Sequence, residues 1–123
     1  MSRRKIYPLK PWETALKEST RENGYNRMSQ TLYKHPAFKA LTTSERFIYL
    51  VMVNVAAGKE VFSFPRATYV EYGLSHVSVI RAIKKLVQAG FLVIRENNKA
   101  LRKPNIYQFS YSWKENDTAK KPP

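Results

Sequence analysis

The fold of this chain is decided by the stretch Pro65-Arg-Ala-Thr-Tyr-Val-Glu-Tyr-Gly-Leu-Ser75. Proline is favoured in the first turn of a helix, so we expect a short helix over residues 65–72 that ends at Gly73. Ser75 is a favourable N-cap, and a second helix should follow from His76 to Ala89. Two helices joined by a short turn that contains glycine form a helix-turn-helix. The stretch therefore predicts this motif.

The second expected helix has two distinct faces at 100° per residue. Its apolar face carries Val79, Ile80, Ile83, Leu86 and Val87, with Val77 at the edge. Its other face carries Ser78, Arg81, Ala82, Lys85 and Gln88, with Lys84 beside them. Surface helices usually mix charges of both signs, whereas this helix has no acidic residue. A small, polar, cationic face is typical of a helix that enters the DNA major groove, although a solvated surface helix is the alternative.

A strand, a basic loop and a second strand are predicted to follow. Residues 91–94 are a short, continuous apolar run prone to β-structure and are predicted to form a buried strand, and residues 105–113 alternate as a second strand. The polar loop between them should turn at Asn97-Asn98. Residues 75–114 contain eight lysines and arginines and one acid, a net charge of +7 of the chain's +13. This order of elements is that of a winged helix, and its charge favours DNA binding.

Four segments resemble the winged-helix superfamily of bacterial DNA-binding proteins: Phe64-Pro-Arg66, Tyr72-Gly-Leu-Ser75, Arg81-Ala-Ile-Lys-Lys-Leu86 and Ala89-Gly-Phe-Leu92. Lys103-Pro-Asn-Ile-Tyr107, with Phe109, Ser110 and Trp113, resembles replication-initiator domains and small winged-helix proteins of Gram-positive plasmids and conjugative elements. The superfamily resemblance covers about residues 35–113. It implies an α+β fold with a three-helix core and a small antiparallel sheet. Such proteins act as repressors, initiators or conjugation accessories, so the resemblance leaves the role open.

The composition limits the class of protein. A chain of 123 residues has room for one domain, and its 43% apolar and 13% aromatic content fits a folded protein. Its net charge of +13 indicates a polyanionic partner, either nucleic acid or an anionic membrane surface. The longest apolar run, residues 47–57, is too short to span a bilayer. With no cysteine, the chain suits the cytosol. We therefore expect a cytoplasmic protein without a membrane partner.

The segment before the helix-turn-helix should supply the rest of the core. Thr42-Thr-Ser-Glu45 is a capping box, in which two side chains satisfy free backbone N–H groups. It opens a helix from Thr43 to about Ala57, which Gly58 ends. This helix is apolar over most of its circumference and is predicted to be the central buried helix, with Tyr49 and Met52 reaching past the core into a partner.

We divide the chain into a basic N-terminal extension (1–34), a winged-helix domain (35–114) and a disordered tail (115–123). The domain should also contain a helical turn over 36–41 and a first strand over 61–64.

The extension is expected to be partly helical between Trp12 and Glu22, or flexible. Its first cations, Arg3, Arg4 and Lys5, are candidates for an arm that follows a DNA groove. The alternative is an extension that packs Trp12 on the domain. We expect a combination, ordered near Trp12 and loose at the arm.

Alternation places Tyr107, Phe109, Tyr111 and Trp113 on one face of the last strand. An exposed row of rings beside cations stacks single-stranded nucleic acid. A strand of a small domain must bury one face, however, so packing on the central helix is favoured. Trp113, at the end, is expected to be the free ring.

Catalysis and metal binding have little support. His35 and His76 are the only histidines, and neither has a second ligand at metal-binding spacing. The chain lacks a glycine-rich phosphate loop, a Ser-His-Asp order and a carboxylate pair suited to Mg²⁺. We predict a non-enzyme with no cofactor, no metal and no small-molecule ligand. His76 is a candidate DNA contact or an exposed helix-start residue, and His35 a loop residue.

The sequence thus predicts a protein that binds double-stranded DNA with sequence preference at an operator or an origin of a mobile element. A homodimer is expected because one domain covers one half-site, and other proteins of the same element are further expected partners. The alternatives are a single-stranded nucleic-acid binder and a protein-interaction winged helix. The candidate DNA-binding residues are Arg66, Ser75, His76, Ser78, Arg81, Ala82, Lys84, Lys85, Arg95, Asn97, Asn98, Lys99, Arg102 and Lys103.

Overall fold

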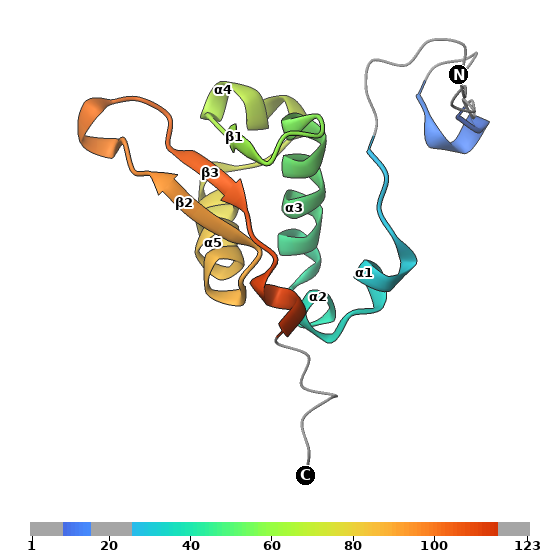
Figure 1. Cartoon of the computed structure of the whole chain (residues 1–123). Coiled ribbons are helices and arrows are strands. Elements are labelled where there is room, and N and C mark those ends of the chain that lie inside the picture. Colours follow the sequence, from blue (N-terminus) through green and yellow to red (C-terminus); the bar gives the residue numbers. More distant parts are fainter. Residues whose placement is uncertain (1–8, 16–25, 116–123) are drawn as a thin grey trace, which may run out of the picture.

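The computed structural model describes residues 9–15 and 26–115. Over these ranges the chain is α+β, with helices packed around a small three-stranded antiparallel sheet (Figure 1). This arrangement is compatible with a winged-helix-like layout. The predicted basic arm, most of the helix expected over 12–22 and nearly all of the predicted tail lie outside the described residues.

Over the described residues, three α-helices precede the first strand, two α-helices lie between the first and second strands, and the third strand follows the second. The helices are α1 (Gln30–Lys34), α2 (Pro36–Lys39), α3 (Thr43–Ala56), α4 (Arg66–Tyr69) and α5 (His76–Ala89). The strands are β1 (Val61–Ser63), β2 (Leu92–Glu96) and β3 (Ile106–Phe109). Short 3₁₀ turns are η1 (Pro11–Glu13), η2 (Val70–Tyr72), η3 (Lys99–Leu101) and η4 (Ser112–Glu115). None of the described helices is long and apolar enough to cross a lipid bilayer.

The capping box predicted for α3 is present. The Thr42 Oγ1 accepts a hydrogen bond from the Glu45 N–H at 3.2 Å, and the Glu45 Oε1 accepts one from the Thr42 N–H at 2.8 Å. At the other end Ala57 takes a left-handed conformation with φ 51° and ends the helix. The capping box thus fixes the N-terminus of α3 as predicted, whereas the left-handed residue that ends the helix is Ala57 and not Gly58, which follows with φ 86°.

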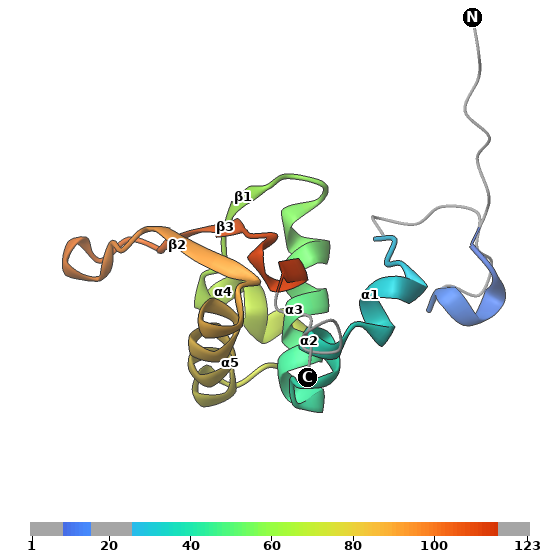
Figure 2. The same cartoon turned by 60° about the horizontal axis from the view of Figure 1, so that its bottom comes forward.

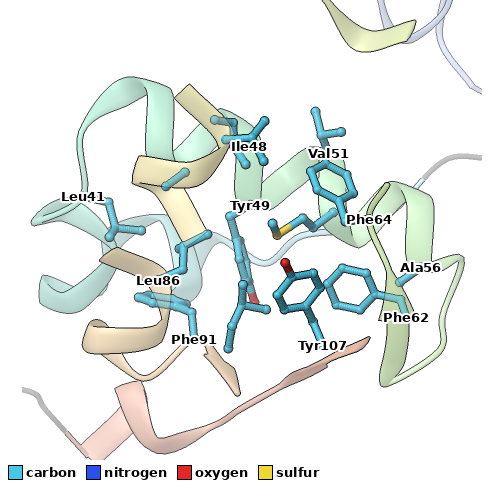
Figure 3. Packing of buried hydrophobic residues seen from close by; sticks show 14 of the residues in the cluster. Leu41, Ile48, Tyr49, Val51, Ala56, Phe62, Phe64, Leu86, Phe91 and Tyr107 are labelled. Atoms are coloured by element: carbon cyan, nitrogen blue, oxygen red, sulfur yellow. The ribbon is translucent and has the colours of Figure 1, made fainter. Parts of the chain in front are cut away.

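The centre of the core is the side chain of Tyr49, which Figure 3 shows between the helices and the sheet. Its ring meets those of Phe91 at 5.2 Å, Phe109 at 5.9 Å and Phe38 at 6.2 Å between centroids. Tyr49 and Met52 are both buried within the chain. The expectation that they reach past the core is therefore wrong, because the sheet and α2 fill the space around α3.

The sheet has the strand order β1-β3-β2, with both pairs antiparallel. Phe62 lies opposite Tyr107, and Leu92 lies opposite Phe109, so these side chains turn toward the core. Between Ile94 and Glu96 the register slips by one residue, which places Arg95 in a β-bulge.

The last predicted strand is shorter than expected. It ends at Phe109 rather than Trp113, and the chain then turns into η4. The Trp113 ring is buried and stacks on Phe91, with centroids 5.0 Å apart and planes 10° apart. Trp113 is thus not the free ring. Trp113 covers the core next to the C-terminus of α5, because the 3₁₀ turn brings its side chain back onto Phe91.

An additional short helix, α1, precedes the predicted domain start. The Ser29 hydroxyl oxygen accepts a hydrogen bond from the Leu32 N–H at 3.1 Å, and Leu32 is buried in the core. His35 is more than a loop residue, because its Nδ1 accepts from the Ala37 N–H at 3.0 Å and caps α2. Trp12, in contrast, is 81% exposed, so it does not pack on the domain.

Candidate nucleic-acid interface

The helix-turn-helix predicted from the sequence has α4, η2, a turn and α5 as its parts. The first helix tightens into a 3₁₀ turn after Tyr69, and Gly73 ends it with φ 76°. The Ser75 Oγ accepts a hydrogen bond from the Ser78 N–H at 3.2 Å, which confirms Ser75 as the N-cap of α5. Capping holds the first turn of α5 in place relative to the turn before it.

His76 is fixed from the first helix of the pair. Its Nδ1 lies 2.9 Å from the hydroxyl of Tyr69, whose ring is buried. The His76 side chain is itself exposed. This hydrogen bond ties α4 to the start of α5, so His76 has a structural role whether or not its ring also contacts a ligand.

The buried face of α5 differs from the predicted one. Val79, Ala82 and Leu86 are its buried side chains, and Ala82 is only 1% exposed. Ile80, which we expected in the core, is 52% exposed. Ala82 therefore cannot contact DNA, and this prediction is wrong. The physical reason is size, because the small alanine side chain can be enclosed where α5 packs closely against its neighbours.

The exposed face of α5 is cationic and partly apolar. It consists of Val77, Ile80, Arg81, Lys84, Lys85 and Gln88, all exposed to solvent. Of the predicted contacts, Ser78 is half-buried, and its hydroxyl oxygen accepts a hydrogen bond from that of Ser75 at 2.9 Å. Because α5 packs on α3, the exposed face is turned away from the body of the molecule.

The loop between β2 and β3 projects on the same side of the molecule as α5 (Figures 1 and 2). Figure 2 shows it extending well beyond the sheet. Its cations Lys99, Arg102 and Lys103 are all exposed. The loop and α5 therefore present lysines and arginines on one side.

Asn97 and Asn98 shape this loop from within. The Asn98 Nδ2 donates to the Pro104 carbonyl at 3.0 Å, and the Asn98 N–H donates to the Asn105 Oδ1 at 2.7 Å. The Asn97 Oδ1 accepts from the Lys99 N–H at 3.2 Å. Each asparagine thus satisfies backbone groups of the turn. These hydrogen bonds hold the loop, and with it the cations, in position. The sequence alone does not distinguish this structural role from direct contact with DNA.

Arg95 and Arg66 stand apart from the loop tip. The Arg95 guanidinium donates to the Gln108 Oε1 at 3.1 Å, and the Gln108 amide donates to the Glu60 carboxylate at 2.8 Å. Arg95 is therefore held along the sheet by a chain that ends in an acid. Arg66, the first residue of α4, is exposed.

The aromatic residues of the C-terminal segment do not form an exposed row. Tyr107 and Trp113 are buried, and Phe109 packs partly buried against the core. Only Tyr111 of these four rings is exposed, with the Lys114 Nζ 5.6 Å from its centroid. Packing on the core, which we favoured, is confirmed for the other three.

Sequence reasoning missed exposed apolar side chains on three elements: Val77 and Ile80 on α5, Val93 and Ile94 on β2, and Leu101 in η3. Hydrophobic periodicity places the apolar stripe of a helix in the core, so Ile80 was assigned to the buried face and Val77 to its edge. The signal that distinguishes them is Ala82, whose enclosure turns these two residues outward.

No protein-family model, curated protein or solved structure matches this chain. The functional argument therefore depends on the geometry and charge of the surface itself.

Proposed function

We propose that this chain is a winged helix that binds double-stranded DNA with sequence preference. In this proposal α5 is the recognition helix, which enters the major groove through its exposed face. The β2–β3 loop is the wing, whose cations contact the neighbouring backbone or the minor groove. The observation that carries the proposal is an exposed helix face with three cations and no acid, beside a projecting loop with three more.

This combination suits a duplex better than other polyanions. An α-helix fits the width of the major groove, and arginine can pair with guanine there through two hydrogen bonds. Lysines beside it meet phosphates, which supply affinity without reading sequence. Of the predicted contacts, the proposal keeps Arg66, Arg81, Lys84, Lys85, Lys99, Arg102 and Lys103 as the principal cations. It gives Arg95 a lesser part, because Gln108 already holds its guanidinium.

The single-stranded alternative loses its main support, since three of the four rings it requires pack in the core. The protein-interaction alternative predicts little nucleic-acid binding above about 150 mM salt, where weak non-specific attraction is mostly screened. We also propose that the chain is not an enzyme. The resemblance of residues 103–113 supports a role at an operator or an origin of a mobile element.

The test is fluorescence anisotropy with four probes: a random duplex, oligo(dT), and duplexes from the protein's own genetic neighbourhood in native and shuffled order. At 150–200 mM salt we expect one native neighbourhood duplex to stay bound while the other probes dissociate, because non-specific contacts depend most on phosphates. Equal loss of all four would contradict sequence-preferring binding. Preferential binding of oligo(dT) would favour a single-stranded ligand instead.

A further inference from the structure

The outer face of α5 combines two features, exposed apolar side chains and a cluster of cations without an acid. Val77 and Ile80 are 58% and 52% exposed and stand one turn apart. Arg81, Lys84 and Lys85 share this face, and α5 has no acidic residue. Both apolar side chains are β-branched, so in a helix they hold one preferred rotamer and lose little freedom on contact. The surface therefore offers rigid methyl groups within a cationic field.

A second copy of this chain does not suit the face. In a two-fold dimer the same patch would lie against itself, so the cations of one copy would oppose those of the other. Neither α5 would supply an acid to neutralise them. Two apolar side chains also fall far short of the roughly 800 Å² per partner that a stable interface buries. The homodimer that we expect must therefore use a different surface.

The major groove offers partners for both features. Phosphates line its rim, and acceptor atoms on its floor suit arginine and lysine. The C5 methyl of thymine is the apolar group that projects from that floor. Val77 and Ile80 lie in the N-terminal half of α5, the half of a recognition helix that contacts base edges in helix-turn-helix complexes.

We propose that Val77 and Ile80 read thymine methyl groups, so that the target duplex carries thymines where the N-terminal half of α5 enters the groove. This inference rests on the proposed function and adds a base preference to it. Arg81, one residue after Ile80, reads an adjacent base pair, while Lys84 and Lys85 meet phosphates.

The test begins with the full chain and a random-core duplex library, from which bound duplexes are selected. The selected duplex is then resynthesised with deoxyuridine in place of thymidine at each position in turn. Deoxyuridine removes one methyl group and keeps the base pair. We expect affinity to fall about 3- to 10-fold at one or more positions, as expected for the loss of a buried methyl contact.

Two variants assign the effect to side chains. Val77→Ala and Ile80→Ala should each weaken binding to the thymine duplex by a similar factor and lose the response to deoxyuridine at one position. Val93→Ala is the matched control, because Val93 is also exposed but lies on β2. It should keep both the affinity and the full deoxyuridine response. Because all three side chains are exposed, thermal unfolding should change little.

The outcomes separate this inference from the proposed function. If a duplex is selected and every deoxyuridine form binds as tightly as the thymidine form, the methyl readout is overturned and sequence-preferring binding stands. Deoxyuridine effects that persist unchanged in both Val77→Ala and Ile80→Ala would also overturn it. If no duplex is enriched, the proposed function fails and this inference with it.

Discussion

At the scale of single residues, Tyr49 carries the clearest electrostatic consequence of folding. Burial among three aromatic rings disfavours the charged phenolate and, with a smaller contribution from Tyr111, raises the pKa of Tyr49 to about 12 from an ordinary value of 10. In the unfolded chain the phenol titrates near its ordinary value. The stability that comes from keeping it neutral is therefore complete below pH 10 and is lost as the pH rises toward 12.

We expect the free energy of unfolding to fall by about 2 kcal/mol through this one group between pH 10 and pH 12. The measurement is urea unfolding over that pH range, compared with Tyr49→Phe. In the variant, the part of the fall in unfolding free energy that comes from Tyr49 should be absent. A smaller fall should remain, to which Tyr107 contributes because burial also raises the pKa of that phenol. Parallel pH profiles for the two proteins would contradict the assignment.

Gly90 is constrained by its backbone and by its neighbours. It has φ 89°, and a Cβ there would lie 2.7 Å from the Ser112 Oγ and 2.9 Å from the Trp113 backbone nitrogen. Gly73 has a similar φ of 76° with nothing within 4 Å of such a Cβ. The two glycines therefore separate conformational strain from steric clash.

We expect Gly73→Ala to lower the free energy of unfolding by about 1–2 kcal/mol, the strain of a left-handed alanine. Gly90→Ala should lower it by about 2–4 kcal/mol, since overpacking adds to the strain and η4 must shift. Chemical unfolding of both variants measures the difference. Equal losses would show that η4 yields freely and does not hold Trp113 in place.

At the scale of elements, the sequence predicts best what is determined locally. The bounds of α5 and the N-terminus of α3 agree with prediction because Ser75 and the Thr42–Glu45 capping box satisfy backbone groups within their own turns. Helix α1 was missed, since its five residues show no periodicity and its stability depends on burial of Leu32.

What the sequence could not predict depends on contacts between distant segments. Alternation continues to Trp113, yet β3 ends at Phe109, because η4 places Trp113 on Phe91 at the far end of α5. Which side chains of α5 face the core also depends on contacts with distant segments. It depends on how closely the helix approaches its neighbours, and Ala82 permits that approach. The bounds of the candidate helix α5 were therefore predicted correctly, but part of its exposed face was assigned wrongly.

The roles proposed for α5 and for the β2–β3 loop give a prediction at this scale. Arg81→Ala should relax sequence preference at one or two base pairs, at about 1–3 kcal/mol each, because it removes hydrogen bonds to base edges. Lys103→Ala should weaken all duplexes alike, because its proposed partner is phosphate. Both side chains are exposed, so neither change should affect folding.

The measurement is competition binding with the selected duplex and single-base variants of it. Equal losses on selected and shuffled duplex for Arg81→Ala would contradict the placement of α5 in the groove. A loss of preference for Lys103→Ala would show instead that the wing reads bases.

At the scale of the whole molecule, the arrangement of charge is what joins the fold to its proposed function. The chain has a net charge of +13, and the exposed cations of α5 and of the loop lie on the side away from the α3 core. The core itself holds no buried charged side chain among the described residues. The described part of the chain therefore folds without burying a charged side chain, and its cations stay on the surface, where a polyanion can bind them.

This arrangement predicts a steep dependence of DNA affinity on salt. If about six to eight of the exposed cations contact phosphates, the logarithm of the association constant should fall with the logarithm of salt concentration with a slope of about −5 to −7. Affinity would then drop about 10³-fold or more between 50 and 200 mM salt. Replacing Lys99 and Lys103 together by alanine should make the slope shallower by about two, because two counterion releases are lost. Gln88→Ala, which removes an exposed α5 side chain without changing charge, should leave the slope unchanged. A slope near −2 in the unaltered protein would mean that most of these cations meet no phosphate, and the basic surface would then fit an acidic protein partner better than a duplex.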